Sequence, residues 1–177
     1  MKILVAYASK HGATAEIAAA IAGELTGRGH ETDLRDASDV RSVATYDAVV
    51  LGSAIYYGHW LAAAHGLVSE LGAQLRIRAV WAFSSGRVAG HPEVDMDEAH
   101  VAWVLAQSGA REHRSFAGRL AGDELDWRER VATRAIHAQP GDYRDWAQIA
   151  SWAGAIATEL GTNGPARRSV RRTRLIA

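Results

Sequence analysis

Residues 2–25 read KILVAYASKHGATAEIAAAIAGEL, and this stretch decides the fold because a strand pattern passes directly into a helix pattern. The run from Lys2 to Ala8 is almost entirely apolar, which predicts a strand buried on both faces of a parallel sheet. After a short loop, residues suited to burial recur at helical spacing until Gly27 and Gly29 end the helix. They are Thr14, Ile17, Ala18, Ile21, Ala22 and Leu25. A buried strand that leads into an amphipathic helix is typical of an α/β protein.

The same alternation continues along the chain. Ala48–Gly52 and Ala79–Phe83 are apolar runs that predict two more buried strands, and an apolar helical stretch from about Trp60 to Leu71 separates them. Val94–Leu105 has the spacing of a further helix. A final amphipathic helix is predicted from Trp146, Ile149, Ala150, Ala153, Ile156, Ala157 and Leu160.

Two more predicted strands, Glu31–Asp36 and Arg114–Ala121, carry charged residues. Charges suit the edges of a sheet better than its centre. A doubly wound sheet with the order 2-1-3-4-5 has its second and fifth strands at the edges, where these two segments fall. The sequence therefore predicts an α/β three-layer sandwich around a five-stranded parallel sheet with this order.

Length and composition indicate one domain. The chain has 177 residues, 48% of them apolar and 23% charged, which is enough for a compact core. No stretch reaches the roughly 20 apolar residues of a membrane-spanning helix, and the first apolar run is too short for a secretory signal, so we expect a cytoplasmic protein without a transmembrane segment. Cysteine is absent, which excludes disulfides and cysteine-based catalysis. Redox chemistry would therefore need a bound cofactor.

Charge is balanced overall but not along the chain. Basic and acidic residues each number 20, so the total gives no reason to expect a nucleic-acid partner. Five of the bases lie after Gly161 in a segment without acids, which leaves 15 bases against 20 acids, a net charge of −5, in the preceding chain. We expect residues 1–160 to form the domain and residues 161–177 a basic, flexible tail.

One connection is longer than the few residues usual in such folds. Residues 122–141 separate the fifth predicted strand from the final helix, which indicates an insertion beside the binding site. Trp127, Val131 and Ala135 keep helical spacing within it, so a short surface helix is predicted there.

The loop Ser9–Thr14 carries the strongest chemical signal. It lies between a buried strand and a helix, so its backbone amides lie at the positive end of the helix dipole. Ser9 and Thr14 add hydroxyl donors, and Gly12 permits a close approach of the backbone to a ligand. The loop is neither a G-x-G-x-x-G fingerprint nor a P-loop, which argues against a dinucleotide or ATP. It predicts a terminal-phosphate site made by Ser9, Lys10, His11, Gly12, Ala13 and Thr14; the alternative is an ordinary turn with a threonine cap.

Two further segments are predicted to meet this loop at the carboxyl ends of the central strands. Gly52–Trp60 follows the third strand and Ser84–Arg87 follows the fourth. Ligands of open α/β sheets bind at that edge. Tyr56 and Tyr57 have aromatic faces suited to a flat conjugated ring, whereas Trp60 is expected to begin a helix and to pack in the core.

Neither a metal site nor a hydrolytic site is predicted. The eight histidines include no H-x-x-x-H or H-E-x-x-H spacing, and no set of serine, histidine and aspartate can be singled out.

The chain resembles the flavodoxin family across roughly Lys2 to Leu160. Three patterns are similar to those of menaquinone-dependent protoporphyrinogen dehydrogenases: Ser9-x-x-Gly-x-Thr14, Gly52-Ser-Ala-Ile-Tyr-Tyr-Gly-His-Trp60 and Gly141-Asp-Tyr-Arg-Asp-Trp146. The middle pattern is the most specific. The resemblance implies a flavodoxin-like doubly wound three-layer sandwich with a five-stranded parallel sheet in the order 2-1-3-4-5.

By this resemblance the ligand is FMN. The loop Ser9–Thr14 would cradle its phosphate, and two segments would line its isoalloxazine ring. On one side lie Ser53, Ala54, Ile55, Tyr56, Tyr57 and Gly58, and on the other lie Ser84, Ser85, Gly86 and Arg87. The flavin carries the redox chemistry, so no catalytic residue of the protein itself is predicted.

The implied function is an FMN-binding oxidoreductase that transfers electrons from an organic donor, such as a protoporphyrinogen, to a quinone or another acceptor. In that branch an arginine commonly occupies the position of Tyr56, and the late insertion is more apolar and basic than here. Residues 123–130 are strongly charged, which disfavours easy contact with a membrane and its quinone pool. The substrate, and a peripheral association with the membrane, therefore stay open.

Three alternatives remain. One is a flavodoxin-type electron carrier that docks with partner proteins, although carrier flavodoxins are typically far more acidic than a charge of −5. The second is a protein that binds a deazaflavin in place of FMN. The third concerns assembly: Trp152 lies about 90° from the centre of the final helix's apolar stripe, so we expect it to be partly exposed, where it could mark a homodimer interface.

Overall fold

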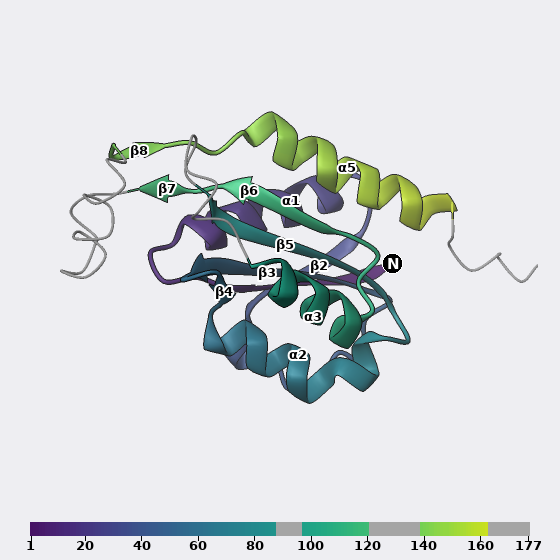
Figure 1. Cartoon of the computed structure of the whole chain (residues 1–177). Helices are drawn as coiled ribbons and strands as arrows, with labels where there is room; N and C mark the ends of the chain where they lie inside the picture. Colours follow the sequence, from purple (N-terminus) through teal and green to yellow (C-terminus); the bar gives the residue numbers. More distant parts are fainter. Residues whose placement is uncertain (88–96, 121–138, 163–177) are drawn as a thin grey trace, which may run out of the picture.

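Five parallel strands form the central sheet. The computed structural model describes residues 1–87, 97–120 and 139–162. The strands are β1 (Lys2–Ala8), β2 (Glu31–Asp36), β3 (Ala48–Tyr56), β5 (Ala79–Arg87) and β6 (His113–Ala117). Their order is β2-β1-β3-β5-β6, which confirms the predicted order 2-1-3-4-5 (Figure 1). The numbering differs because a two-residue strand, β4 (His59–Trp60), pairs antiparallel with the end of β3 and lies off this path.

Helices cover both faces of the sheet and make the three predicted layers (Figure 1). On one face lie α1 (Ala13–Gly27) and α5 (Trp146–Thr162), and on the other lie α2 (Ala62–Leu75) and α3 (Glu98–Ser108). Side chains of β1 alternate between the two cores: Leu4 and Ala6 pack with α2, whereas Ile3 and Val5 pack with α1 and α5. Both faces of the strand are therefore buried, as its apolar run predicts.

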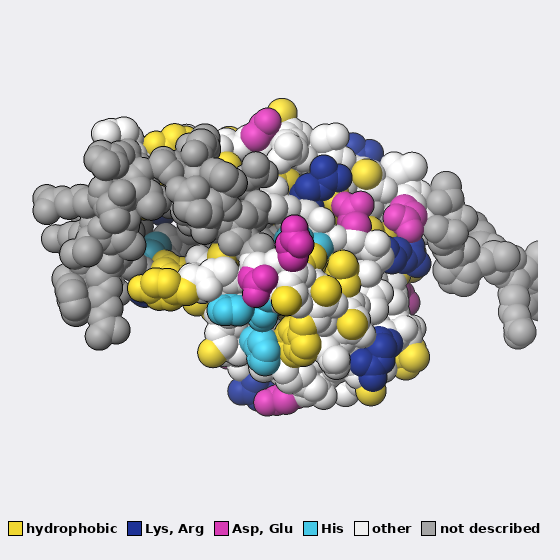
Figure 2. All heavy atoms as spheres, in the orientation of Figure 1, with side chains coloured by type: hydrophobic (Ala, Val, Ile, Leu, Met, Phe, Trp, Pro, Cys, Tyr) yellow, Lys and Arg dark blue, Asp and Glu magenta, His cyan; other side chains and the backbone are white. Residues whose placement is uncertain are grey.

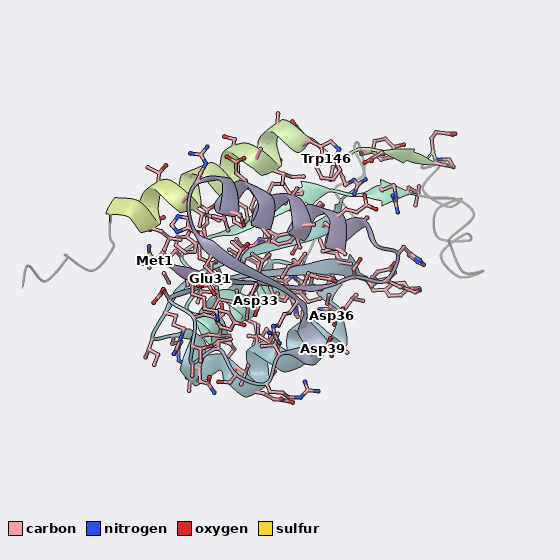
Figure 3. All side chains as sticks on the ribbon, turned by 180° about the vertical axis from the view of Figure 1, so that it is seen from behind. Met1, Glu31, Asp33, Asp36, Asp39 and Trp146 are labelled. Carbon is pink, nitrogen blue, oxygen red and sulfur yellow. The ribbon has the colours of Figure 1, made fainter. Side chains whose placement is uncertain are left out.

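The two outer strands are polar, as predicted. Every residue of β2 is at least partly exposed, and Asp33 accepts hydrogen bonds from Tyr46 and Arg35. Figure 3 shows Glu31, Asp33 and Asp36 along this edge, with Asp39 in the short helix η1 (Ala37–Asp39) that follows. These charges keep the open edge of β2 in water.

The central strands are longer than predicted. Gly52–Trp60 and Ser84–Arg87 were expected as loops, but β3 runs to Tyr56 and β5 to Arg87. The reason is pairing: β3 stays hydrogen-bonded to β5 as far as Ala54 and Ser85, and then folds back as a hairpin with β4. The segment predicted as one strand over Arg114–Ala121 is instead split at Gly118 into β6 and a separate strand, β7 (Arg119–Leu120).

Trp152 corrects a second expectation. It is 5% exposed rather than partly exposed. Its indole ring packs edge-on against Phe83 and Phe116, and its N–H donates to the Glu112 carboxylate. Helical geometry gave the direction of the side chain, but it could not show the aromatic cluster that covers it. Trp152 therefore gives no support to a homodimer interface.

Several predictions concern residues outside the described ranges. The helix predicted over Val94–Leu105 corresponds to α3, which begins at Glu98. Residues 94–96 of the prediction lie outside the described ranges. The short helix predicted at Trp127, Val131 and Ala135 and the arginine-rich tail lie outside the described residues, so they stay predictions. None of the helices that the structure describes is long and apolar enough to span a membrane.

Gly52 provides a test of the central packing. A Cβ atom on Gly52 would lie 2.1 Å from the ring of Phe83, which is fully buried on the neighbouring strand. We expect Gly52→Ala to lower the free energy of unfolding by about 1 to 3 kcal/mol, because the buried ring, which packs against Phe116 and Trp152, would have to shift. Urea denaturation at equilibrium measures the change.

Gly66→Ala is the matched control, since nothing lies within 4 Å of a Cβ atom at this helical position. It should stabilise the protein by about 0.5 to 1 kcal/mol through helix propensity. Equal stability of Gly52→Ala and the wild type would contradict the proposed packing.

Candidate functional site

The loop between β1 and α1 has the geometry of an anion site. Gly12, the residue that precedes α1, has φ +77°, a conformation that glycine adopts without strain. No side chain in the described part of the chain caps the amides of the first turn of α1. Among the described residues, no atom would lie closer than 4.0 Å to a Cβ atom on Gly12, so these residues leave space beside the loop backbone. Uncapped amides at the positive end of a helix dipole favour a negatively charged ligand.

Ser9 strengthens this reading. Its Oγ is buried but has no hydrogen-bond partner in the described part of the chain. A buried hydroxyl without a partner is unfavourable by about 1 to 3 kcal/mol, so such groups commonly mark the place of a ligand. A phosphate oxygen at the loop would supply the missing acceptor. The residues of the loop therefore fit a phosphate group.

Thr14 ties the loop to the sheet. Its Oγ1 lies 2.7 Å from Ser85 Oγ of β5, and both residues are buried. The start of α1 is thus joined directly to the carboxyl-terminal part of β5. This contact brings together two of the three predicted segments.

The third segment is the hairpin formed by β3 and β4. Tyr57 and Gly58, the two turn residues, have φ +50° and +79°, as in the type I′ turns of tight hairpins. Tyr57 at the tip is 80% exposed. Lys10 Nζ lies 5.0 Å from the centre of the Tyr56 ring, so the hairpin lies beside the loop Ser9–Thr14, here called the anion loop.

Asp97, just before α3, and His100 within it form hydrogen bonds with the backbone of the hairpin. The Asp97 N–H donates to Gly58 O at 3.0 Å, and the Trp60 N–H donates to His100 Nε2 at 3.3 Å. The Nε2 atom of His100 must be unprotonated to accept this bond. Burial lowers the pKa of His100, and the nearby charges of His59 and His65 lower it further, which favours the neutral form.

These histidines form a small cluster with Trp103. The ring of His65 is stacked on that of Trp103 at a centroid distance of 4.1 Å, and His59 meets His100 edge-on at 5.0 Å. Figure 2 shows histidine side chains gathered beside hydrophobic ones over α2 and α3. Among the described residues no group of three or more potential ligands could hold a metal ion. Through His100, which accepts from the Trp60 N–H, the cluster contacts the hairpin.

Some predicted ligand residues are already used inside the protein. Ser84 Oγ accepts from Trp60 Nε1 at 2.8 Å and lies 2.7 Å from His113 Nε2. Ser53 Oγ accepts from the N–H of Leu61 at 3.0 Å, and both serines are fully buried. The Ser84 hydroxyl joins the end of β5 to β4 and β6, and the Ser53 hydroxyl joins β3 to the start of α2, which leaves them little capacity for a ligand.

Gly86 of β5 lies close to the backbone of Ile55 in β3. Gly86 has φ +133° at a break in the register of β5 and β6, and a Cβ atom there would lie 3.4 Å from Ile55 O. The side chain of Ile55 is in the core. Only the backbone of these two residues is therefore suited to line a ligand. The side chain of Arg87 lies outside what the structure describes.

The structure adds three residues that were not predicted: Glu16, Arg119 and Arg144. Arg144 binds Glu16 Oε2 at 2.7 Å and Asp142 Oδ2 at 2.6 Å, and its side chain is only 3% exposed. Arg119 binds Glu16 Oε1 at 3.1 Å. The Gly141–Trp146 pattern contained Arg144 but gave no role for it, and nothing in the sequence marked Arg119.

These ion pairs shift the pKa values of the acids. Hydrogen bonds from Arg144 lower the pKa of Asp142 to about 2, and they also lower the pKa of Glu16. The same contacts raise the pKa of Arg144. Figure 3 shows Trp146 at the start of α5. The Arg144 guanidinium lies 4.4 Å from the centre of the Trp146 ring.

Comparison with known proteins gives a consistent result. Residues 4–146 match the family model described as a flavodoxin domain. The chain is 28% identical over 172 residues to a protein named protoporphyrinogen IX dehydrogenase (quinone) from Escherichia coli strain K12, and the match covers 89% of this chain and 95% of that one.

Solved structures agree in fold. A flavodoxin from the domain Archaea is similar with a TM-score of 0.63 and 17% identity, over 91% of this chain and 99% of that one. Oxidised flavodoxin 1 from Bacillus cereus has the same TM-score at 16% identity, over 90% and 99% of the two chains. Rubredoxin oxygen:oxidoreductase from Desulfovibrio gigas also matches at 0.63 and 16% identity over 91% of this chain, which spans 36% of that larger protein.

The Asp142–Arg144 pair predicts a dependence of stability on pH. The folded pKa of about 2 lies below the ordinary value of 3.8, so the unfolded chain takes up the proton first as the pH falls. The contribution of the pair is complete above pH 3.8 and is lost as the pH falls through about 2. We expect it to be modest, because the Asp142 side chain is 42% exposed and water screens the pair.

NMR titration of the Asp142 carboxyl carbon measures this pKa directly. Arg144→Met should return it toward 3.8, because the main source of the shift is removed. A wild-type Asp142 that titrates at its ordinary value would contradict the pairing.

Proposed function

This chain belongs to the flavodoxin-domain family, and on that premise we propose that it is an FMN-dependent oxidoreductase that passes electrons from an organic donor to a quinone. The observation that carries the proposal is the buried hydroxyl of Ser9, which has no partner in the described chain and stands at an uncapped helix start. This is the place where a flavodoxin-like sheet would bind the phosphate of FMN.

The phosphate would be held by the loop Ser9–Thr14. Its amides would donate from the first turn of α1, and the hydroxyl of Ser9 would donate from the end of β1. Lys10 would add positive charge near the hairpin, since its ammonium lies over the ring of Tyr56. Donors from backbone and side chain would thus surround one anionic group.

The ring system would lie between the hairpin and the end of β5. Tyr56 and Tyr57 would offer aromatic faces, while Ala54 and Gly86 would let the backbone approach closely. A bound FMN would supply reversible one- and two-electron chemistry. The protein would orient the ring and limit the access of water to it.

The choice of donor and acceptor rests on similarity. The Escherichia coli relative named as a protoporphyrinogen IX dehydrogenase is matched over nearly its whole length, which supports a porphyrinogen-like donor and a quinone acceptor. The exposed ring of Tyr57 at the tip of the hairpin also supports a flat donor such as a porphyrinogen and a flat acceptor such as a quinone. It would offer them a flat apolar surface beside the flavin position.

A first experiment tests the cofactor and the reaction. Purified protein that is incubated with FMN and then freed of unbound flavin should show a visible flavin spectrum. The protein should release an equimolar amount of FMN, identified by mass. The reduced protein should then be reoxidised faster by a soluble menaquinone analogue than by a redox partner protein, and protoporphyrinogen IX should be oxidised in its presence. A protein that takes up no FMN would contradict the proposal, and one that takes it up without reacting with quinone would indicate a carrier.

Ser9→Ala gives a sharper test of the phosphate site. Because the Ser9 hydroxyl has no partner among the described residues, its removal should leave the thermal stability of the protein without flavin unchanged or slightly higher. The dissociation constant for FMN should rise by about 10- to 100-fold, the equivalent of about 1 to 3 kcal/mol. Isothermal titration calorimetry and a thermal melt measure the two effects.

Ser69→Ala is the control, because the exposed hydroxyl of Ser69 bonds to His65 within α2. It should bind FMN like the wild type. Unchanged FMN affinity in Ser9→Ala would count against the assigned loop.

A further inference from the structure

Two arginines bind the backbone of the anion loop: Arg119 of β7 and Arg144, which follows the short strand β8 (Gly141–Asp142). We infer that Arg119 and Arg144 fix the loop Ser9–Thr14 in its phosphate-binding conformation by binding its carbonyl groups and the side chain of Glu16. This inference rests on the proposed function, since FMN phosphate is the ligand of the loop there. It assigns a positioning role to two side chains that lie outside the five-stranded parallel sheet.

The contacts converge on one short stretch of backbone. Arg119 donates to His11 O at 3.2 Å, and Arg144 donates to Ala13 O at 3.3 Å. The same two side chains bind Glu16, each through a different carboxylate oxygen, at 3.1 and 2.7 Å. Glu16 is itself joined to the loop, because its N–H donates to Gly12 O at 3.0 Å.

The direction of these contacts matters for the ligand. In a planar trans peptide the C=O of one residue and the N–H of the next point in opposite directions. Because the two guanidinium groups bind His11 O and Ala13 O, the N–H groups of Gly12 and Thr14 are directed away from the arginines. These are the amides that would donate to a phosphate, so the arginines act on the ligand through the backbone.

Arg144 is fixed firmly enough to serve as a support. Its guanidinium binds Asp142 through two nitrogens at 2.8 and 2.6 Å and packs on the ring of Trp146. Arg119 and Asp142 are paired residues of the two-stranded sheet formed by β7 and β8 (Gly141–Asp142). Since a bidentate, mostly buried arginine loses little further entropy on binding, it can hold a loop in one conformation.

Glu16 explains why two arginines are present. A carboxylate in the first turn of α1 stabilises the helix dipole but repels an anionic ligand. With both oxygens bound by guanidinium groups, its charge is neutralised, and its lowered pKa agrees with this pairing. Glu16 then serves as the point of attachment for the two arginines. Together with Asp142 the four side chains have no net charge, so their effect on the ligand is one of geometry.

The test combines one measurement that needs no flavin with one that does. Arg144→Met removes every donor but keeps an apolar stem for packing on Trp146, and Arg144→Lys keeps one charged donor. Amide hydrogen exchange at Glu16, whose N–H is bound to Gly12 O of the loop, should be about tenfold faster in Arg144→Met than in the wild type, with an intermediate rate in Arg144→Lys, in protein without added flavin. Arg35→Met, which removes an exposed pair with Asp33 on β2, is the matched control and should leave this rate unchanged.

The second measurement compares FMN with riboflavin, which lacks the phosphate. Arg144→Met should raise the dissociation constant for FMN by about tenfold and that for riboflavin by less than about twofold, because only the phosphate meets the loop. Unchanged amide exchange in Arg144→Met, or an equal loss of affinity for both flavins, would overturn the inference. Failure of the wild type to bind FMN would instead contradict the proposed function, and the exchange measurement distinguishes the two failures because it requires no flavin.

Discussion

The parallel pairing of β1, β3 and β5 is the constraint on which the rest of the molecule depends. Parallel strands end at the same edge of a sheet, so whatever follows each strand must meet its neighbours there. The anion loop, the β3–β4 hairpin and the bulge at Gly86 are brought together in this way. Helices on both faces bury the strands, and the edge at their carboxyl ends is left to the loops.

The sequence predicted the fold well because the relevant signals are local. Continuous apolar runs marked the central strands, charges marked β2 and β6 as edges, and helical spacing marked α1, α2 and α5. The ends of β3 and β5 were predicted too short. Serines, tyrosines and glycines near Gly52 and Ser84 resemble a loop by composition, but hydrogen bonds to the neighbouring strands keep them in the sheet. Such pairing depends on residues far away in the chain.

The candidate site could be predicted only in part for the same reason. The loop Ser9–Thr14 is a continuous motif and was visible, whereas the arginine support joins residues more than 100 positions apart, such as Glu16 and Arg119. Hydroxyls raised a different difficulty. Ser9 and Ser84 look alike in the sequence, yet Ser84 is bound to Trp60 and His113, and Ser9 has no partner in the described chain. Only the arrangement in space separates a hydroxyl that joins strands from one that can meet a ligand.

The turn at the tip of the hairpin has a thermodynamic consequence. Tyr57 adopts a left-handed conformation in which a residue with a Cβ atom is disfavoured by about 1 to 2 kcal/mol, and glycine or asparagine would relieve that strain. The chain instead displays a large aromatic ring there, with 80% of the residue in contact with solvent. Local stability is therefore lower than the same turn allows with another residue. Attempts to make the protein more heat-resistant at this position would remove the ring that the hairpin presents.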